Sequence, residues 1–159
     1  MTRSLVLAAA LAAAAASPAL GQARPTKAEA ALGARLKQWP ELVNDGKIDQ
    51  ALAYFVPNPT IVEDLAPYRW TGPTAGKAWI DGMAANTERA GMSAVAMHFS
   101  DPAMVQIAGR HAYAVMPGAL TYSFKDGKVA HAHGHAILTL QKLGASWRIE
   151  TMAWGWERP

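Results

Sequence analysis

Three histidines spaced two residues apart are the side chains of this sequence whose types could most readily do chemistry together. His131, His133 and His135 would share one face of a β-strand, with neighbouring Cα atoms about 6.6–7 Å apart. Two such imidazoles can bind one metal ion, with His98, Asp64 or Glu150 as a further ligand. They can equally transfer protons or donate hydrogen bonds in a pocket, or simply line a partly exposed strand. Because nothing in the sequence fixes a complete ligand set, we predict no metal site and no cofactor.

Two turn signals predict which side chains lie near these histidines. Asp126-Gly127 is a strong hairpin signal and Gly144-Ala145 a weaker one. Two-residue turns at both places would collect rings, thioethers and imidazoles on one face, which is the chemistry of a small-molecule pocket. A β-bulge would reverse part of this assignment. The expected cross-strand pairs are His131 with Tyr122, His133 with Leu120 and Trp156, His135 with Trp154, and Ile137 with Met116 and Met152.

The elements that must position these side chains are predicted to be helices first and strands afterwards. Thr26 and Glu29 form a capping-box signal, followed by apolar residues at helical spacing up to Val43, with Pro40 expected to kink or end that helix. Further helices are predicted around 48–55 and after Gly72-Pro73, and a short strand over 60–63. From Met92 the period is two, with strands expected at 94–100, 103–108, 111–124, 128–142 and 146–156. This order predicts one α+β domain, 24–159, with about three helices on a bent, mainly antiparallel sheet.

The first 23 residues are predicted to be a secretory signal peptide. Arg3 is followed by a short apolar run and by small residues that allow cleavage after Gly21 or Ala23. The run is shorter than a bilayer-spanning helix needs, so we expect a periplasmic or secreted protein with no membrane segment in its mature form. The chain has no cysteine, which excludes disulfides and thiolate chemistry. Its net charge of +3 comes from scattered residues, and we expect no nucleic-acid partner.

The order of elements and two sequence stretches resemble the nuclear transport factor 2-like superfamily, in particular a functionally uncharacterised SnoaL-like branch. The stretches are Ile61-Val62-Glu63-Asp64 before a proline-containing loop, continuing to Pro73, and the terminal segment 147–156. The resemblance covers residues 28–156 and implies a cone-like roll of helices on a strongly bent sheet. It implies little about the reaction, because this fold hosts many unrelated activities.

Comparison with the ketosteroid isomerases of that superfamily implies specific roles. Asp64, after Val62-Glu63, falls on the position of their catalytic base. Their two oxyanion donors correspond to Trp39 and Thr139 here, so the usual oxyanion pair is missing and strict ketosteroid isomerase activity is not expected. His133, His135, Tyr122 or Tyr68 could serve as substitute donors. The candidate catalytic residues are Asp64, His133 and His135. The candidate ligand contacts are Tyr68, His98, Met116, Tyr122, His131, Ile137, Thr139, Met152, Trp154 and Trp156.

Three functions remain open from the sequence. The first is an exported protein that binds a small, largely apolar or aromatic molecule without altering it. The second is a proton-transfer enzyme, an isomerase, cyclase or dehydratase, with Asp64 as base and pocket histidines as acid or oxyanion donors. The third is an interaction module whose open sheet forms a homodimer or docks a partner. Asp64 could also merely cap its loop or pair with Arg69.

Overall fold

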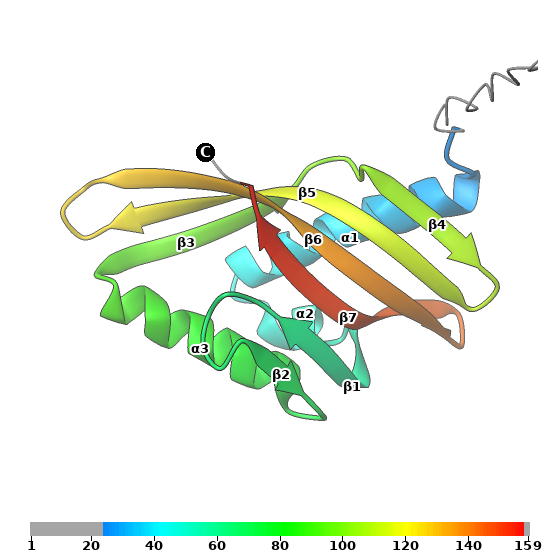
Figure 1. The fold of residues 1–159 in the computed structure, drawn as a ribbon, viewed down its shortest axis with the longest axis horizontal. Helices are drawn as coiled ribbons and strands as arrows, with labels where there is room; N and C mark the ends of the chain where they lie inside the picture. The colour runs from blue at the N-terminus through cyan, green and yellow to red at the C-terminus, as the bar shows by residue number, and fades with distance from the viewer. Residues whose placement is uncertain (1–23, 158–159) are drawn as a thin grey trace, which may run out of the picture.

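A computed structural model describes residues 24–157, so the predicted signal peptide lies outside the described residues. Within that range the chain forms three helices packed on one bent seven-stranded sheet (Figure 1). The α+β prediction is therefore confirmed. The elements are α1 (Lys27–Asn44), α2 (Ile48–Leu52), β1 (Phe55–Val62), β2 (Arg69–Thr71), α3 (Ala75–Arg89), β3 (Met92–Phe99), β4 (Met104–Ala108), β5 (His111–Phe124), β6 (Val129–Leu143) and β7 (Ser146–Trp156).

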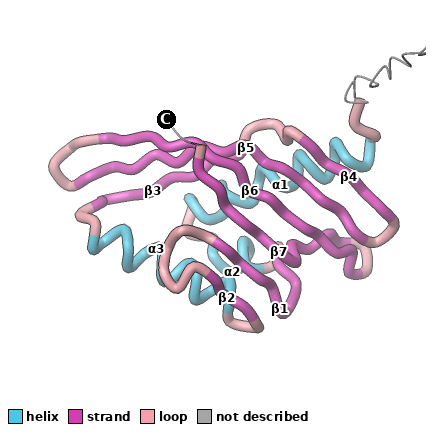
Figure 2. The backbone as a smooth tube through the Cα atoms, in the orientation of Figure 1, coloured by secondary structure: helices cyan, strands magenta, loops and turns pink. Residues whose placement is uncertain are grey.

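The sheet is mixed, and its strand order is β2-β1-β7-β6-β5-β3. All its strand pairs are antiparallel except β1 with β7, which run parallel (Figure 1). Figure 2 shows these strands side by side in the sheet. β5 is long enough to serve two neighbours on one edge. β4 pairs with its first half, from His111 to Val115, and β3 pairs with its second half, from Gly118 to Phe124. The sheet is bent, and its outer strands β2, β3 and β4 do not pair with one another to close it.

The N-terminal helix begins as the sequence predicted. The Thr26 side chain accepts a hydrogen bond from the Glu29 amide and the Glu29 carboxylate accepts one from the Thr26 amide, which completes a capping box. Leu32, Leu36 and Trp39 are buried on its inner face. Pro40 does not end the helix, which continues to Asn44. No helix in the described part of the chain has both the length and the apolar character needed to cross a bilayer.

The predictions for residues 48–63 were partly wrong. The second helix stops at Leu52, and Phe55 is the first residue of β1, not part of a helical stripe. β1 also runs through Pro57-Asn58-Pro59, so it begins earlier than the short strand predicted over 60–63. The register of β1 with β7 shifts across this stretch, between Phe55 and Thr60. An irregular stretch of strand tolerates prolines, because fewer ladder hydrogen bonds are required there.

The turn between β5 and β6 has three residues where two were predicted. The Phe124 amide donates to the Lys128 carbonyl, so residues 125–127 form the loop, with Gly127 at φ +86°. One extra loop residue moves the pairing by one position, so His131 lies opposite Thr121 and not Tyr122. A slip of one residue places every side chain of β6 on the other face of the sheet. The predicted pairs of His133 with Leu120 and Ile137 with Met116 were therefore also wrong.

A second irregularity changes the pairing of β6 with β7. Leu140 lies opposite Ile149 as predicted, but the register shifts after this pair, and Thr139 lies opposite Thr151. Glu150 is the extra residue, so the strand carries the bulge that the sequence analysis left open. The predicted pairs of His133 with Trp156, His135 with Trp154 and Ile137 with Met152 were wrong for this reason. His135 lies opposite Gly155, and Trp154 lies opposite Ala136.

Candidate functional site

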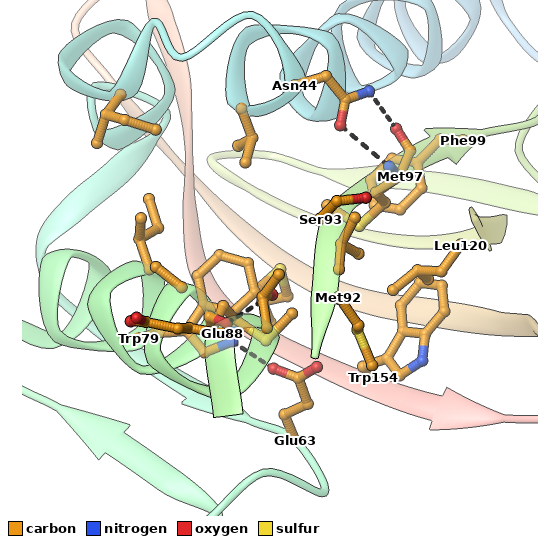
Figure 3. A pocket seen from close by; sticks show the side chains of 18 of the residues that line it. Asn44, Glu63, Trp79, Glu88, Met92, Ser93, Met97, Phe99, Leu120 and Trp154 are labelled. Atoms are coloured by element: carbon orange, nitrogen blue, oxygen red, sulfur yellow. Dashed lines mark hydrogen bonds between the residues drawn. The ribbon is translucent and has the colours of Figure 1, made fainter. Parts of the chain in front are cut away.

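A cavity of about 430 Å³ opens between the helices and the sheet. Helix α3, the C-terminal end of α1 and strand β3 form most of its wall, and β5 and β7 contribute its floor (Figure 3). Four methionines and several branched aliphatic and aromatic side chains make the lining mainly apolar. The lining residues are Val43, Asn44, Ile48, Val62, Glu63, Trp79, Ile80, Met83, Ala84, Thr87, Glu88, Met92, Ser93, Val95, Met97, Phe99, Leu120, Lys125, Met152 and Trp154.

Glu63 is the buried charged residue of this cavity. It is 9% exposed, and its Oε2 accepts a hydrogen bond from the indole Nε1–H of Trp79, which joins the end of β1 to helix α3 (Figure 3). Burial raises the pKa of the Glu63 carboxyl, the Trp79 hydrogen bond opposes that rise, and the nearby charge of Asp64 adds to it. A buried carboxyl in an apolar cavity can accept, hold or donate a proton.

Sequence reasoning chose Asp64, and the structure places its neighbour in the cavity. Asp64 is exposed and does not line the cavity, whereas Glu63, directly after the end of β1, is buried and lines it. The signal for this was available. Ile61 is apolar and completely buried, and period-two alternation puts residue 63 on the same side as residue 61. Glu63 is thus a candidate that the sequence analysis missed.

The phenol of Tyr122 lies within electrostatic reach of this carboxyl. Tyr122 follows Leu120 on the inward face of β5 at alternate positions, and it is half-buried. Its burial, together with the charges of Asp64 and Glu63, raises the pKa of Tyr122 to about 12. The phenol therefore keeps its proton at neutral pH and is available as a hydrogen-bond donor.

The uncharged polar side chains of the cavity are already engaged with backbone groups. The Asn44 amide donates to the Met97 carbonyl over 2.8 Å and accepts from the Met97 amide over 3.0 Å (Figure 3). Thr87 Oγ1 donates to the Met83 carbonyl, and Ser93 Oγ donates to the Ser123 carbonyl. These bonds fix the wall. Among the described lining residues, the buried groups with hydrogen-bonding capacity to spare are the Glu63 carboxyl and the Nε1–H of Trp154, which has no hydrogen-bond partner.

Trp154 forms part of the floor because two glycines make room for it. Gly118 and Gly134 are cross-strand partners on β5 and β6. A Cβ atom on Gly134 would lie 2.8 Å from the Trp154 ring, and one on Gly118 would lie 2.9 Å from it. The indole stacks on Phe99 with ring centroids 6.5 Å apart, and it meets Trp156 edge-on at 5.3 Å. The flat surface under this ring thus depends on residues that carry no side chain.

The histidines lie on the opposite side of the sheet from the cavity. We define the outer face as the side of β6 that carries His131, His133, His135, Ile137 and Thr139. Ile137 is 41% exposed, whereas Leu138, its neighbour on the inward side, is completely buried. His131 Nδ1 lies 3.2 Å from Thr121 Oγ1, and His135 Nδ1 lies 3.4 Å from Glu157 Oε1. The prediction that the histidines share a face with the inward rings was wrong, because of the three-residue turn and the bulge.

The other predicted contacts divide between the cavity and its surroundings. Met152 and Trp154 line the cavity. Met116 is completely buried and does not line the cavity, and the Nε1 atom of Trp156, like that of Trp154, is buried without a hydrogen-bond partner among the described residues. Tyr68 is 62% exposed, with φ at +68°, and His98 points outward to within 2.8 Å of Glu41 Oε1. The structure therefore brings few of the predicted residues together.

Across residues 24–157 no three His, Asp or Glu side chains come close enough together to hold a metal ion. Trp39, which corresponds to an oxyanion donor in the ketosteroid isomerase comparison, is buried and donates its Nε1–H to the Ala51 carbonyl over 3.2 Å. Its indole is therefore engaged in the core.

Comparisons with known proteins give the fold. No protein-family model matches the chain, and no curated protein matches it in sequence. A nuclear transport factor 2-like superfamily protein from Salmonella enterica superposes with a TM-score of 0.64 at 13% identity, over 81% of this chain and 90% of that chain. An NTF2-like protein with a cystatin-like fold from Novosphingobium aromaticivorans gives a TM-score of 0.63 at 17% identity, covering 77% of each chain.

A third solved structure shows the range of proteins with this architecture. It is a hexachlorocyclohexane dehydrochlorinase, LinA type 2, with a TM-score of 0.64 at 5% identity, over 81% of this chain and 84% of that chain. Identities this low carry information on the fold and not on the activity. The chain has the nuclear transport factor 2-like fold.

Proposed function

We propose that this protein is exported to the periplasm or the medium and binds a small, largely apolar molecule in the cavity between α3, β3 and β7. The observation that carries the proposal is a cavity of about 430 Å³ whose apolar lining holds one buried carboxyl. Sites for small molecules typically combine a volume of roughly 300–1,000 Å³ with mostly apolar walls and few polar groups. The apolar body would lie against the methionines, and Glu63 would orient it.

The test is calorimetric titration with 2-naphthylmethanol, a neutral aromatic probe, against the wild type and two variants of α3. Ala84 lines the cavity and is exposed enough to accept a larger side chain, whereas Ala85 is exposed but does not line it. We expect saturable one-to-one binding that Ala84→Phe weakens and Ala85→Phe leaves unchanged. Equal affinities of the two variants would place the probe elsewhere, and the absence of saturable binding would refute the proposal.

A second candidate function is proton-transfer catalysis of the isomerase, cyclase or dehydratase type, and the state of Glu63 favours it. Its carboxyl has a raised pKa, a fixed hydrogen bond from Trp79, and the protonated phenol of Tyr122 within electrostatic reach. Such a group can remove a proton beside a carbonyl and return it elsewhere. Glu63 would then take the role that the sequence comparison gave to Asp64.

This second candidate is tested by deuterium exchange at the α-carbons of 2-tetralone in D₂O, followed by NMR. Catalysis predicts exchange that Glu63→Gln abolishes and Asp64→Asn preserves. Exchange at the solvent rate in the wild-type protein would leave binding alone as the function of this cavity.

A further inference from the structure

The Glu63 carboxylate in the cavity forms no salt bridge with any described residue. Its Oε2 accepts one hydrogen bond, from Trp79. Its Oε1 accepts none from the described residues, and Figure 3 shows the carboxylate between Trp79 and Trp154. A buried charge is costly unless a partner of opposite sign compensates it. A positively charged ligand would supply that partner.

The other charges near the cavity are mostly of the same sign. Glu88 lines the cavity from α3, and Asp64 adjoins Glu63 on the chain. Neither takes part in an ion pair among the described residues. Lys125 is the basic residue of the lining, and it does not pair with Glu63. The potential of Glu63 and Asp64 reaches as far as Tyr122, whose phenol ionises less readily because of it.

The uncharged part of the lining also suits a cation. Trp79 and Trp154 contribute aromatic rings, whose negative π faces attract an ammonium group, whereas the Phe99 ring is stacked with both Trp39 and Trp154. Trp79 and Trp154 lie on the two sides of the space that the Glu63 carboxylate adjoins (Figure 3). An aromatic ring and a carboxylate both attract positive charge, so the two together can bind an organic cation. Neither group requires a particular shape of the ligand's hydrocarbon part.

We propose that the cavity selects small apolar amines, whose ammonium group pairs with Glu63 Oε1 while the hydrocarbon body lies against the methionine side chains. This inference rests on the proposed function, since it names the ligand class of the same cavity. It also assigns Glu63 as the residue that determines specificity. An alcohol of the same size would keep the apolar contacts and lose the charge pairing, and a carboxylic acid would be repelled.

The experiment compares three probes that share one ring system and differ in charge: 2-naphthylmethylamine, 2-naphthylmethanol and 2-naphthoate. Calorimetry at neutral pH should give the amine at least about tenfold higher affinity than the alcohol, as a hydrogen bond to a charged partner provides. The naphthoate should bind at least about tenfold more weakly than the alcohol. Glu63→Gln keeps the size of the side chain and should bring the amine and the alcohol within about threefold of each other.

Asp64→Asn is the matched control, because it removes a neighbouring charge that does not line the cavity. It should leave most of the amine preference intact. Ligand-induced thermal shifts of the wild-type protein with the three probes provide the same ranking without any variant. An alcohol that binds as tightly as the amine overturns this inference and leaves the proposed function standing. Failure of all three probes overturns both, and an amine preference that persists in Glu63→Gln overturns the role of Glu63.

Discussion

Replacing Gly134 by alanine should displace the floor of the cavity. The new Cβ would lie 2.5 Å from the Gly155 carbonyl oxygen and 2.8 Å from the Trp154 ring. Ordinary carbon–oxygen contacts begin at about 3.3 Å, so the strands must separate by several tenths of an ångström. Overpacking costs typically about 1–3 kcal/mol, and alanine returns about 0.5–1 kcal/mol of the conformational entropy that glycine loses on folding. Since the obstacle is a backbone atom that cannot rotate away, we expect an overpacking cost at the upper end of its range and a net loss of about 2 kcal/mol.

The matched control is Gly155→Ala on the adjacent strand. Its Cβ would meet nothing within 4 Å, so its stability should stay the same or rise slightly. Urea unfolding gives the free energies, and about 2 kcal/mol corresponds to a drop in Tm of about 4–8 °C for a chain of this size. The near-ultraviolet circular dichroism of the tryptophans should change in Gly134→Ala alone. Equal stabilities of the two variants would refute the close packing of the Trp154 ring and the Gly155 carbonyl against Gly134.

Three further outcomes follow from the contacts described. Glu63→Gln should be more stable than the wild type near neutral pH and no more stable near pH 4. The pKa of Glu63 is raised in the folded protein, so the wild type loses stability as the pH rises through that pKa. Urea unfolding at both pH values measures the difference, with Asp64 and Tyr122 left unchanged. Trp79→Phe removes the hydrogen bond that holds the Glu63 pKa down, so carboxyl NMR titration should show that pKa rising further. Thr26→Ala should cost about 1 kcal/mol of unfolding free energy, and Thr26→Ser should restore most of it.

Much of the fold could be predicted because it rests on local signals. The capping box at Thr26 and the strand boundaries after Met92 follow from side-chain type and period alone, and the structure agrees with them to within two residues. The β1 strand could not be predicted in full, since its prolines argue against a strand and only pairing with β2 and β7 overrides them. Non-local pairing of this kind leaves no local pattern.

The candidate site was harder to predict, because the facing of a strand depends on turns and bulges. The Asp126-Gly127 signal correctly located the hairpin, but the same residues fit loops of two or three residues, and that difference decides the face on which His133 lies. The choice between Glu63 and Asp64 was recoverable, since the alternation from Ile61 points to Glu63. The motif resemblance directed attention to Asp64 instead.

The separation of the histidines from the cavity has a consequence for how this protein can diversify. A sheet is one layer of backbone thick, so Leu138 and Ile137 are adjacent in the chain and yet belong to different chemical environments. Substitutions at His131, His133 or His135 can alter the exposed face of β6 while the cavity on the other side of the sheet keeps its shape. The exposed histidine face of β6 and its inward face can therefore change independently of each other.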